Sequence, residues 1–477
     1  MTVFEEALQL WNSMDELRRR RDRYKRFTYG RQWDDPIVNP ENGKVTTERA
    51  LLSKDGRPPL TNNLIRQMVK SVVGRFRQQH LDTDSQLAGN ELAATISRQL
   101  ADLYTLHQLD ELDSRMLEEF LISGIAAQRV GTDPVSKAIG LPVVENVAAN
   151  RLFLSLPSDP RATDIDTIGM LRDLTPQEVV VRWGGTHRGR ATDLLNRLKL
   201  EYDPLRPGQY TAQAEQCDTQ FHTAPPGKVR VIEVWKKEPR DFFRVHDPLK
   251  ATFTLVPGTD EEALLAENRR RARRRQPPLN FRWQLSWQWT ARWFLPTGEL
   301  LMQKSLPPGY SHPFAIKLYP LIDGEIHSLV EDVVDQQKYV NRLINLLDRM
   351  MATAAKGALL YPVEALPDGA EFMDIAKQWS ATDGLVLYQG YANGHIPRQL
   401  STNVGDVGAR DLLKTEMQLF KEISGVTDAL AGRNLNASTG AERYSLEVRN
   451  AAISICDLLD TFNSMLARRD ALLLRHT

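Results

Sequence analysis

The sequence predicts an α+β fold that is predominantly helical, and three observations support this prediction. Apolar residues recur at helical spacing from the start of the chain to about residue 130, and again from about residue 321 onward. Strand-like alternation is concentrated in the middle of the chain. A hydrophobic content of 42% in 477 residues is enough for large buried cores, and no run of about 18 apolar residues indicates a membrane span.

The first 130 residues are expected to form helices. One apolar face repeats every three or four residues at Phe4, Leu8, Trp11, Met14 and Leu17. The segment YGRQWDDP interrupts this pattern at residues 29–36 with a glycine and a proline. A second stripe follows over residues 64–76, with Thr61 or Asn62 available as its N-cap, and a longer helical region is predicted for residues 85–129.

Strands and loops are expected between about residues 140 and 258. The β-branched stretch at residues 228–238 predicts a strand, and Asp247 followed by Pro248 predicts the turn of a hairpin. A short helix is predicted for residues 260–275. The clearest strand is NFRWQLSWQWTARWFLP, in which every odd position from Phe281 to Leu295 is apolar. Alternation of this length indicates a half-buried strand or bent hairpin with tryptophans on one face.

The longest predicted helix runs from Leu321 to Gly357, with Asp323 as its cap. Its apolar residues repeat every seven positions, at Ile326, Val333, Val340, Leu347 and Ala354. At 1.5 Å per residue such a helix would be roughly 50 Å long. Residues 358–410 are expected to mix loop and strand, and two further helices are predicted for residues 407–430 and 438–475.

The charges balance overall, with 61 Lys and Arg against 61 Asp and Glu, but the positive charge is concentrated locally. One basic run covers residues 18–26. The densest cluster packs six arginines into seven positions: Arg269, Arg270, Arg271, Arg273, Arg274 and Arg275. Particular surfaces, and not the whole chain, are therefore expected to meet anions. Two distant cysteines and the absence of a signal-peptide pattern indicate a cytosolic protein with reduced thiols.

Motifs that would indicate catalysis are missing, so we expect no catalytic residues, no metal site and no cofactor. The sequence contains no phosphate-binding GxxxxGK[ST] loop, HExxH, GxSxG or CxxC pair. Glu331, Asp332 and Asp335 could hold a magnesium ion for a nuclease, but their spacing on one helix is more typical of a solvated face. Cys217 has no local partner that would make it a nucleophile.

Two features of the sequence allow more than one interpretation. The tryptophan stripe could stack nucleic-acid bases, although an alternating strand more often forms a core or interface face. The arginine cluster could be solvated charge, a localisation-like patch, or a contact with phosphates or an acidic protein surface. Six charges on about two helical turns cannot all point the same way, so some must be solvated.

The order of these segments resembles the portal proteins of short-tailed bacteriophages, the podovirus type of head-to-tail connector. The resemblance rests on YGRQWDD, GRPPLTNNLIRQMVKSVVG, VIEVWKKE, the arginine cluster with the tryptophan strand, and the stretch from PPGYSHPF to LINLLDRMM. It continues with EISGVTDALAGRNLNASTGAER and covers nearly the whole chain in order.

The resemblance implies a homo-oligomeric ring, a dodecamer, at one capsid vertex, through which viral DNA is packaged and ejected. The implied partners are double-stranded DNA, the terminase packaging motor, a tail adaptor, and the major capsid and scaffold proteins; no membrane is implied. The implied location is the virion, with host cytoplasm during assembly. Because the packaging ATPase is a separate protein in this family, the chain itself is expected not to be an enzyme.

The family's portal fold has a wing, a two-helix stem, a β-containing clip and a helical crown. Carried onto this sequence, the implied parts are a wing at 1–259, stem helices at 260–275 and 321–356, a clip at 276–320, a wing return at 357–430 and a crown at 431–477. A channel loop is implied at about 383–408, and a long C-terminal barrel is expected to be absent.

The resemblance also suggests roles for the two ambiguous features. The six arginines would contact DNA, motor or adaptor at the narrow end of the ring. The implied subunit-interface residues are Trp283, Trp287, Trp289, Trp293, Val333, Val340 and Leu347. Two other functions stay open on the sequence alone: a metal-dependent DNA-processing enzyme such as a nuclease, and a monomeric helical adaptor or scaffold.

Overall fold

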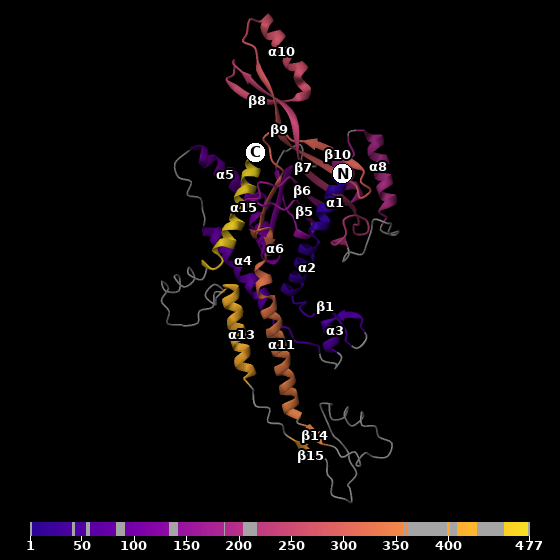
Figure 1. Cartoon of the computed structure of the whole chain (residues 1–477), viewed down its shortest axis with the longest axis vertical. Helices are drawn as coiled ribbons and strands as arrows, with labels where there is room; N and C mark the ends of the chain where they lie inside the picture. Colours follow the sequence, from indigo (N-terminus) through magenta and orange to yellow (C-terminus); the bar gives the residue numbers. More distant parts are fainter. Residues whose placement is uncertain are drawn as a thin grey trace, which may run out of the picture. The chain divides into compact units, whose positions relative to one another are not determined.

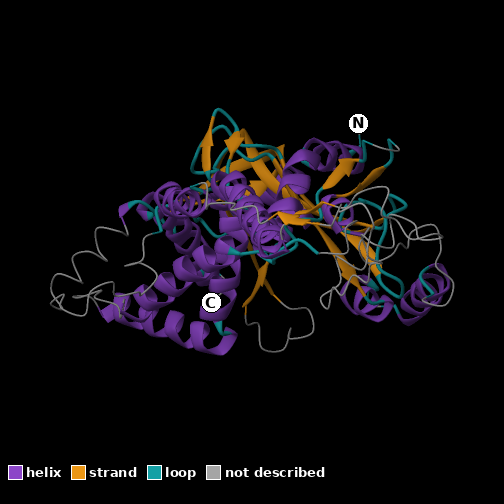
Figure 2. Ribbon diagram, turned by 90° about the horizontal axis from the view of Figure 1, so that it is seen from below, coloured by secondary structure: helices purple, strands orange, loops and turns teal. Residues whose placement is uncertain are grey.

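A computed structural model describes the chain except for residues 1, 41–42, 54–57, 83–90, 133–141, 186, 204–216, 357, 361–397, 401–407, 427–452 and 476–477. The chain divides into two compact units. Unit 1 comprises Met1–Arg31, Ile65–Val334 and Ser424–Thr477, and unit 2 comprises Gln32–Leu64 and Asp335–Ile423. Helices and strands are both abundant (Figure 2), as expected for the predicted α+β class.

The helices of unit 1 follow local sequence signals at their ends. They are α1 (Val3–Ser13), α2 (Asp15–Thr28), α4 (Leu64–Asp82), α5 (Glu91–His107), α6 (Leu109–Ser123), α7 (Pro176–Trp183), α8 (Arg188–Glu201), α10 (Glu261–Arg273), the start of α11 (Leu329–Lys356) and α15 (Cys456–Leu474). Capping boxes start α1 and α7, where Thr2 pairs with Glu5 and Thr175 pairs with Glu178. Gly124 ends α6 with a φ of 72°, a conformation that glycine adopts without steric cost.

The strands of unit 1 pair antiparallel. The main sheet has the order β10-β9-β7-β6-β5, with β8 also paired to β7. Its strands are β5 (Leu152–Leu154), β6 (Thr167–Leu174), β7 (Val229–Asp247), β8 (Thr252–Pro257), β9 (Asn280–Phe294) and β10 (Leu300–Ser305). A second sheet has the order β11-β3-β4, from β3 (Ile125–Thr132), β4 (Pro142–Asn146) and β11 (Phe314–Leu318). The short strands β12 (Pro320–Ile322) and β13 (Glu325–Ile326) form a separate pair.

The core of unit 1 joins α1 to the main sheet and to parts of the second sheet. Ala7 and Trp11 of α1 pack with buried residues of β5, β6, β7 and β9. Gly169 of β6 has no room for a side chain, because a Cβ there would lie 2.2 Å from the Phe153 ring and 2.3 Å from the Glu233 carbonyl oxygen. The sheet therefore needs glycine at this position.

The last helix of the chain is part of the same unit. Phe462 of α15 is fully buried and contacts the rings of Phe76 in α4 and Phe120 in α6, with centroid distances of 5.4 and 5.8 Å. α15 also packs on β11 and β3. Residues 456–474 thus complete the core of unit 1.

Unit 2 is organised around the remainder of α11. Its other described elements are β1 (Pro36–Val38), β2 (Val45–Thr47), α3 (Glu48–Leu52), β14 (Ala358–Leu360), β15 (Arg398–Leu400) and most of α13 (Ala409–Ser424). Gln337, Asn341 and Asn345 lie four residues apart on one face of α11, and their side chains hydrogen-bond the backbone of residues 60–64. We call these three residues the amide ladder.

The structure corrects several predicted boundaries. The helical region expected to reach residue 129 ends at Ser123, because Gly124 terminates α6 and β3 follows. The longest helix begins at Leu329 and not at Leu321, since Asp323 has a φ of 52° in the turn between β12 and β13. The stretch 140–258 contains α7 and α8, which were not predicted. In the described part of the chain, the two predicted C-terminal helices correspond to α13 and α15, and of the channel loop expected at 383–408 only residues 398–400 and 408 are described.

Candidate functional surfaces

The arginine cluster and the tryptophan strand meet in one substructure, which we call the arm (Figure 1). The arm consists of β8, α10 and the distal parts of β7 (residues 238–247) and β9 (residues 280–288). Phe243, Val245 and Leu264 form its small apolar core, so α10 packs against the strands and does not stand alone. The helix predicted at 260–275 is confirmed as α10 (Glu261–Arg273), and it packs against the neighbouring strands of the arm.

One arginine of the cluster is structural. Arg271 is only 9% exposed, and its two terminal nitrogens donate hydrogen bonds of 2.8 and 2.9 Å to the two carboxylate oxygens of Asp247. Arg271 Nε also contacts Glu267 at 3.3 Å. The hydrogen bond from Arg271 holds the pKa of Asp247 well below its usual range. This fork fastens α10 to the end of β7 and takes Arg271 out of the set available to a partner.

The remaining arginines of the cluster are exposed. Arg270 lies 4.0 Å from Glu267, a distance at the limit for an ion pair. Arg269, Arg273, Arg274 and Arg275 are exposed and form no ion pair within the described part of the chain. An exposed arginine without an intramolecular acid is free to meet an external anion.

A second cationic surface on the arm was missed by sequence reasoning. Arg244 of β7 and Arg282 of β9 are directly opposite each other in the strand register, and both are exposed. Beside them, the Arg244 guanidinium lies 4.9 Å from the Phe253 ring centroid, and Phe253 is 63% exposed. Like charges directly opposite in a sheet destabilise it, so this pair favours a counter-charge from outside. Only the pairing register of β7 and β9 shows that Arg244 and Arg282 are neighbours, and this register could not be read from the sequence.

The tryptophan strand is confirmed as β9, but its four tryptophans divide into two pairs. Trp289 and Trp293 are 8% and 7% exposed and belong to the core of unit 1, and their role at a subunit interface stays a prediction. Trp283 and Trp287 are 56% and 57% exposed, and Leu285 between them is 59% exposed. We call these three residues the apolar stripe. Lys237 lies 5.2 Å from the Trp287 ring centroid.

The apolar stripe lies on an open sheet edge. All of β9 is paired with β7 on one side, whereas β10 pairs only with residues 290–294 of β9 on the other. Between Phe281 and Trp287 no described strand covers the outer side of β9, and the outer side of β8 is likewise unpaired in the described structure. An exposed apolar strand edge is a site at which another chain can pair.

The three interface candidates on α11 are not exposed apolar residues. Val333 and Val340 have no exposed surface, and Leu347 is half-buried. Val333 belongs to unit 1, whereas Val340 and Leu347 belong to unit 2. The two valines are thus buried in the single subunit, and their role at a subunit interface stays a prediction.

The three acids that a nuclease would need on α11 do not converge. Ser328 caps the helix, its Oγ accepting a 3.0 Å hydrogen bond from the Glu331 backbone N–H, and the Glu331 carboxylate lies 3.4 Å from Arg20. Burial raises the pKa of Asp332, and Glu331 adds to this effect. Across the residues that the structure describes, no group of three or more His, Cys, Asp or Glu side chains is arranged to hold a metal ion.

The two cysteines are separate, Cys217 buried and Cys456 exposed. Within the described ranges, every helix is too short or too polar to cross a bilayer.

Within the described residues, the arm offers an open apolar edge and exposed arginines without ion pairs, which are surfaces suited to contacts with other molecules. The family follows from the comparison of sequences. The chain belongs to the family described as Phage P22-like portal protein, whose sequence model matches residues 1–468. No curated protein matches the chain.

The family assigns the general function. The protein is a non-enzymatic component of the bacteriophage capsid, a head–tail connector that serves genome packaging. A ring oligomer with capsid and packaging partners is what this family implies.

Proposed function

We propose that this chain forms a ring at one capsid vertex, a dodecamer as the resemblance implies, whose channel carries double-stranded DNA during packaging and ejection. The apolar stripe on the open edge of β9 carries this proposal. Burying a tryptophan that is now half exposed contributes roughly 2 kcal/mol, so covering Trp283 and Trp287 favours association. The open edges of β8 and β9 are different surfaces, so one subunit could present β9 to β8 of the next. Such a contact between unlike surfaces forms a closed ring when the rotation from each subunit to the next divides a full turn evenly.

The arm is then the candidate for the clip, the part of the ring that meets other proteins and DNA. In this proposal α10 belongs to the clip and not to a separate stem helix, because it packs on β7 and β9. α11 stays the candidate stem helix. The wing, the wing return and the crown keep the boundaries implied by the resemblance as proposals.

The exposed arginines supply the electrostatic part of the function. Arg269, Arg270, Arg273, Arg274 and Arg275, repeated in every subunit, would surround the ring with positive charge and attract DNA, the terminase motor or the acidic surface of a tail adaptor. Arg244 and Arg282 extend this charge to the other face of the arm. The major capsid and scaffold proteins are proposed as further partners, met in the host cytoplasm during assembly.

Negative-stain microscopy of purified protein tests the ring, and rings with a central hole are expected. Replacing Trp283 and Trp287 with Ser should leave a folded subunit that does not form rings. Leu200→Ser is a matched control, because Leu200 is 82% exposed on α8, outside the arm. Normal rings from the double variant, or equal loss of rings in the control, would show that the stripe is not the interface.

A further inference from the structure

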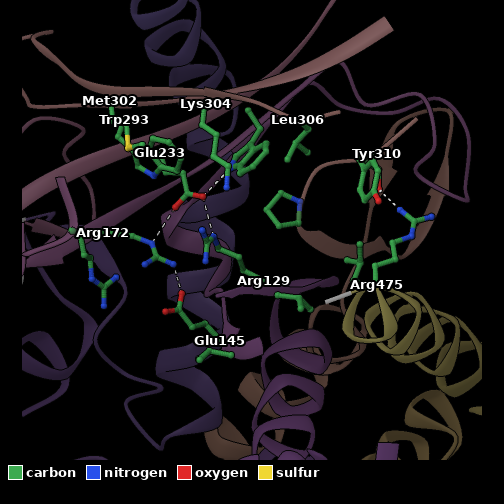
Figure 3. A pocket seen from close by; sticks show the side chains of 18 of the residues that line it. Arg129, Glu145, Arg172, Glu233, Trp293, Met302, Lys304, Leu306, Tyr310 and Arg475 are labelled. Atoms are coloured by element: carbon green, nitrogen blue, oxygen red, sulfur yellow. Dashed lines mark hydrogen bonds and ion pairs between the residues drawn. The ribbon is translucent and has the colours of Figure 1, made fainter. Parts of the chain in front are cut away.

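A cavity of about 680 Å³ opens in unit 1, and no role described so far uses it (Figure 3). Its walls come from both sheets, from the end of α7, from the loop after β10 and from the last turn of α15. This volume lies in the range of about 300–1,000 Å³ that is typical of ligand sites.

The floor of the cavity is a closed ion network. Glu233 has no exposed surface and lies 2.9 Å from Arg129 and 3.2 Å from Arg172. Trp235 Nε1 donates a 2.7 Å hydrogen bond to Glu233, and Arg172 also pairs with Glu145. Burial opposes the ionisation of Glu233, but the two arginines outweigh it and lower its pKa. Two acids thus offset two arginines, and the floor is close to neutral.

The rim of the cavity carries cations that no acid offsets. Arg182 and Lys304 form no ion pair within the described residues. The Arg475 guanidinium lies 3.4 Å from the Ser311 hydroxyl and forms no ion pair with a described acid. Because the floor is neutral, these three side chains give the cavity a positive rim.

Apolar side chains line the wall of the cavity between the floor and the rim. Trp183 and Trp293 lie with their ring centroids 6.1 Å apart, and Met302 and Tyr310 are 43% and 51% exposed. Leu306 and Leu472 complete this lining. An apolar surface next to unpaired cations suits a ligand that carries an apolar group and negative charges together.

We propose that this cavity binds an acidic peptide segment of a partner protein. An aromatic or aliphatic side chain of that peptide would pack against Trp183 and Met302, while its carboxylates would face Lys304, Arg182 and Arg475. A DNA duplex is too wide to enter a cavity of this volume. The site lies apart from the arm and is independent of ring assembly through the apolar stripe.

Tryptophan fluorescence of the full-length protein can test this proposal, because Trp183, Trp235 and Trp293 line the cavity. The probe is a five-residue peptide with one phenylalanine between two pairs of aspartates. Two comparison peptides replace either the aspartates with asparagines or the phenylalanine with glycine. We expect saturable binding of the probe and at least tenfold weaker binding of both comparison peptides.

Three variants locate the binding. Arg182→Glu with Lys304→Glu, and separately Met302→Ala, should each weaken binding of the probe at least fivefold while rings still form. Lys199→Glu, an exposed lysine on α8 outside the cavity, should leave binding unchanged. Equal loss in Lys199→Glu, no effect of Met302→Ala, or no saturation would each overturn the proposal. Displacement of the probe by duplex DNA, or dissociation of rings on adding the probe, would assign the cavity to DNA or to a second copy instead.

Discussion

Arg469 and Asp113 form a 2.5 Å ion pair although neither side chain has any exposed surface. Gln128 donates a 2.8 Å hydrogen bond to the same Asp113 oxygen, and Tyr104 contacts the other end of the Arg469 guanidinium. Burial opposes the charge on Arg469, but Asp113 and Asp470 outweigh it, so the pKa of Arg469 is raised. The pair fastens α15 to α6 and β3.

Removing one partner of this pair should destabilise unit 1 strongly. Arg469→Ala leaves Asp113 buried without its counter-charge, and we expect a loss of about 3–5 kcal/mol in the free energy of unfolding. Denaturant unfolding followed by circular dichroism measures this loss. The double variant Arg469→Met with Asp113→Leu removes both charges and should recover most of the lost free energy of unfolding.

Arg19→Ala is the control for that experiment. Arg19 pairs with Asp15 at 2.8 Å but is 75% exposed, so its loss should cost at most about 1 kcal/mol. A comparable cost for Arg19→Ala and Arg469→Ala would mean that the buried pair has no special role.

The amide ladder of unit 2 should depend on its central member. Asn341 is 2% exposed, accepts a 3.0 Å hydrogen bond from the Asn62 backbone N–H and donates to Gln32. Asn341→Ala removes the acceptor of a part-buried N–H, which costs about 1–3 kcal/mol. Asn345→Ala should lower the free energy of unfolding less, because its hydrogen bonds to residue 60 are exposed and water can replace them. Thermal unfolding of the two variants compares them, and an equal effect would contradict this ranking.

His312 should make unit 1 less stable in acid. Burial, aided by the charge of Arg468, lowers the pKa of His312 to about 3 from 6.5. Below pH 6.5 the unfolded chain therefore binds a proton that the folded protein does not. Stability falls as the pH drops from 6.5 toward 3, by about 1.6 kcal/mol between pH 6.5 and pH 5.

The variant His312→Gln checks this origin. It removes the proton uptake, so the difference in unfolding free energy between pH 7 and pH 5 should shrink by about 2 kcal/mol, whatever the variant costs at pH 7. Leu200→Ser, which changes no titratable group at an 82% exposed position on α8, is the comparison and should leave the difference unchanged. An unchanged pH dependence in His312→Gln would assign the acid sensitivity to other groups.

The arginines of the arm should separate into two kinds. Changing Arg273, Arg274 and Arg275 to Gln should leave rings intact but weaken binding to non-specific duplex DNA. The slope of the logarithm of the binding constant against that of salt concentration should become shallower. If the partner is an acidic protein, the same variant should instead lose motor or adaptor binding while DNA binding stays unchanged. Wild-type behaviour in both assays would mean that these arginines are only solvated.

Arg271→Gln should behave differently, because it breaks the fork to Asp247. We expect faster proteolysis within the arm, detected by limited digestion and mass spectrometry, without a comparable effect from Arg270→Gln. Equal protease resistance in both variants would show that the fork does not hold α10 in place.

Much of the fold could be predicted because it depends on local signals. The alternation in β9, the turn at Asp247 and Pro248, and the helical stripes of α1 and α4 are all present as expected. The start of α11 was wrong because the heptad repeat continues back to Ile326, which is buried in β13 and not in a helix. A periodic pattern cannot show that two apolar residues are buried by different elements.

The candidate surfaces were harder to predict because exposure depends on tertiary contacts. Trp287 and Trp289 have the same place in the alternation, but only Trp289 is covered, next to His312. Likewise, nothing in the sequence distinguishes Arg271 from Arg270. Only the folded arm places Asp247 beside Arg271. The cavity in unit 1 draws residues from segments more than 300 positions apart, so no local motif could reveal it.

The place of α15 in the core has a consequence for how the protein is made. Phe76 and Phe120, whose rings contact Phe462, leave the ribosome hundreds of residues earlier than Phe462. Until α15 is synthesised, these rings lack the contact with Phe462 and the Asp113 carboxylate lacks Arg469, so unit 1 cannot finish folding before residues 456–474 have been made. A nascent chain stalled before residue 456 should therefore expose apolar surface to chaperones, because folding of unit 1 waits for α15.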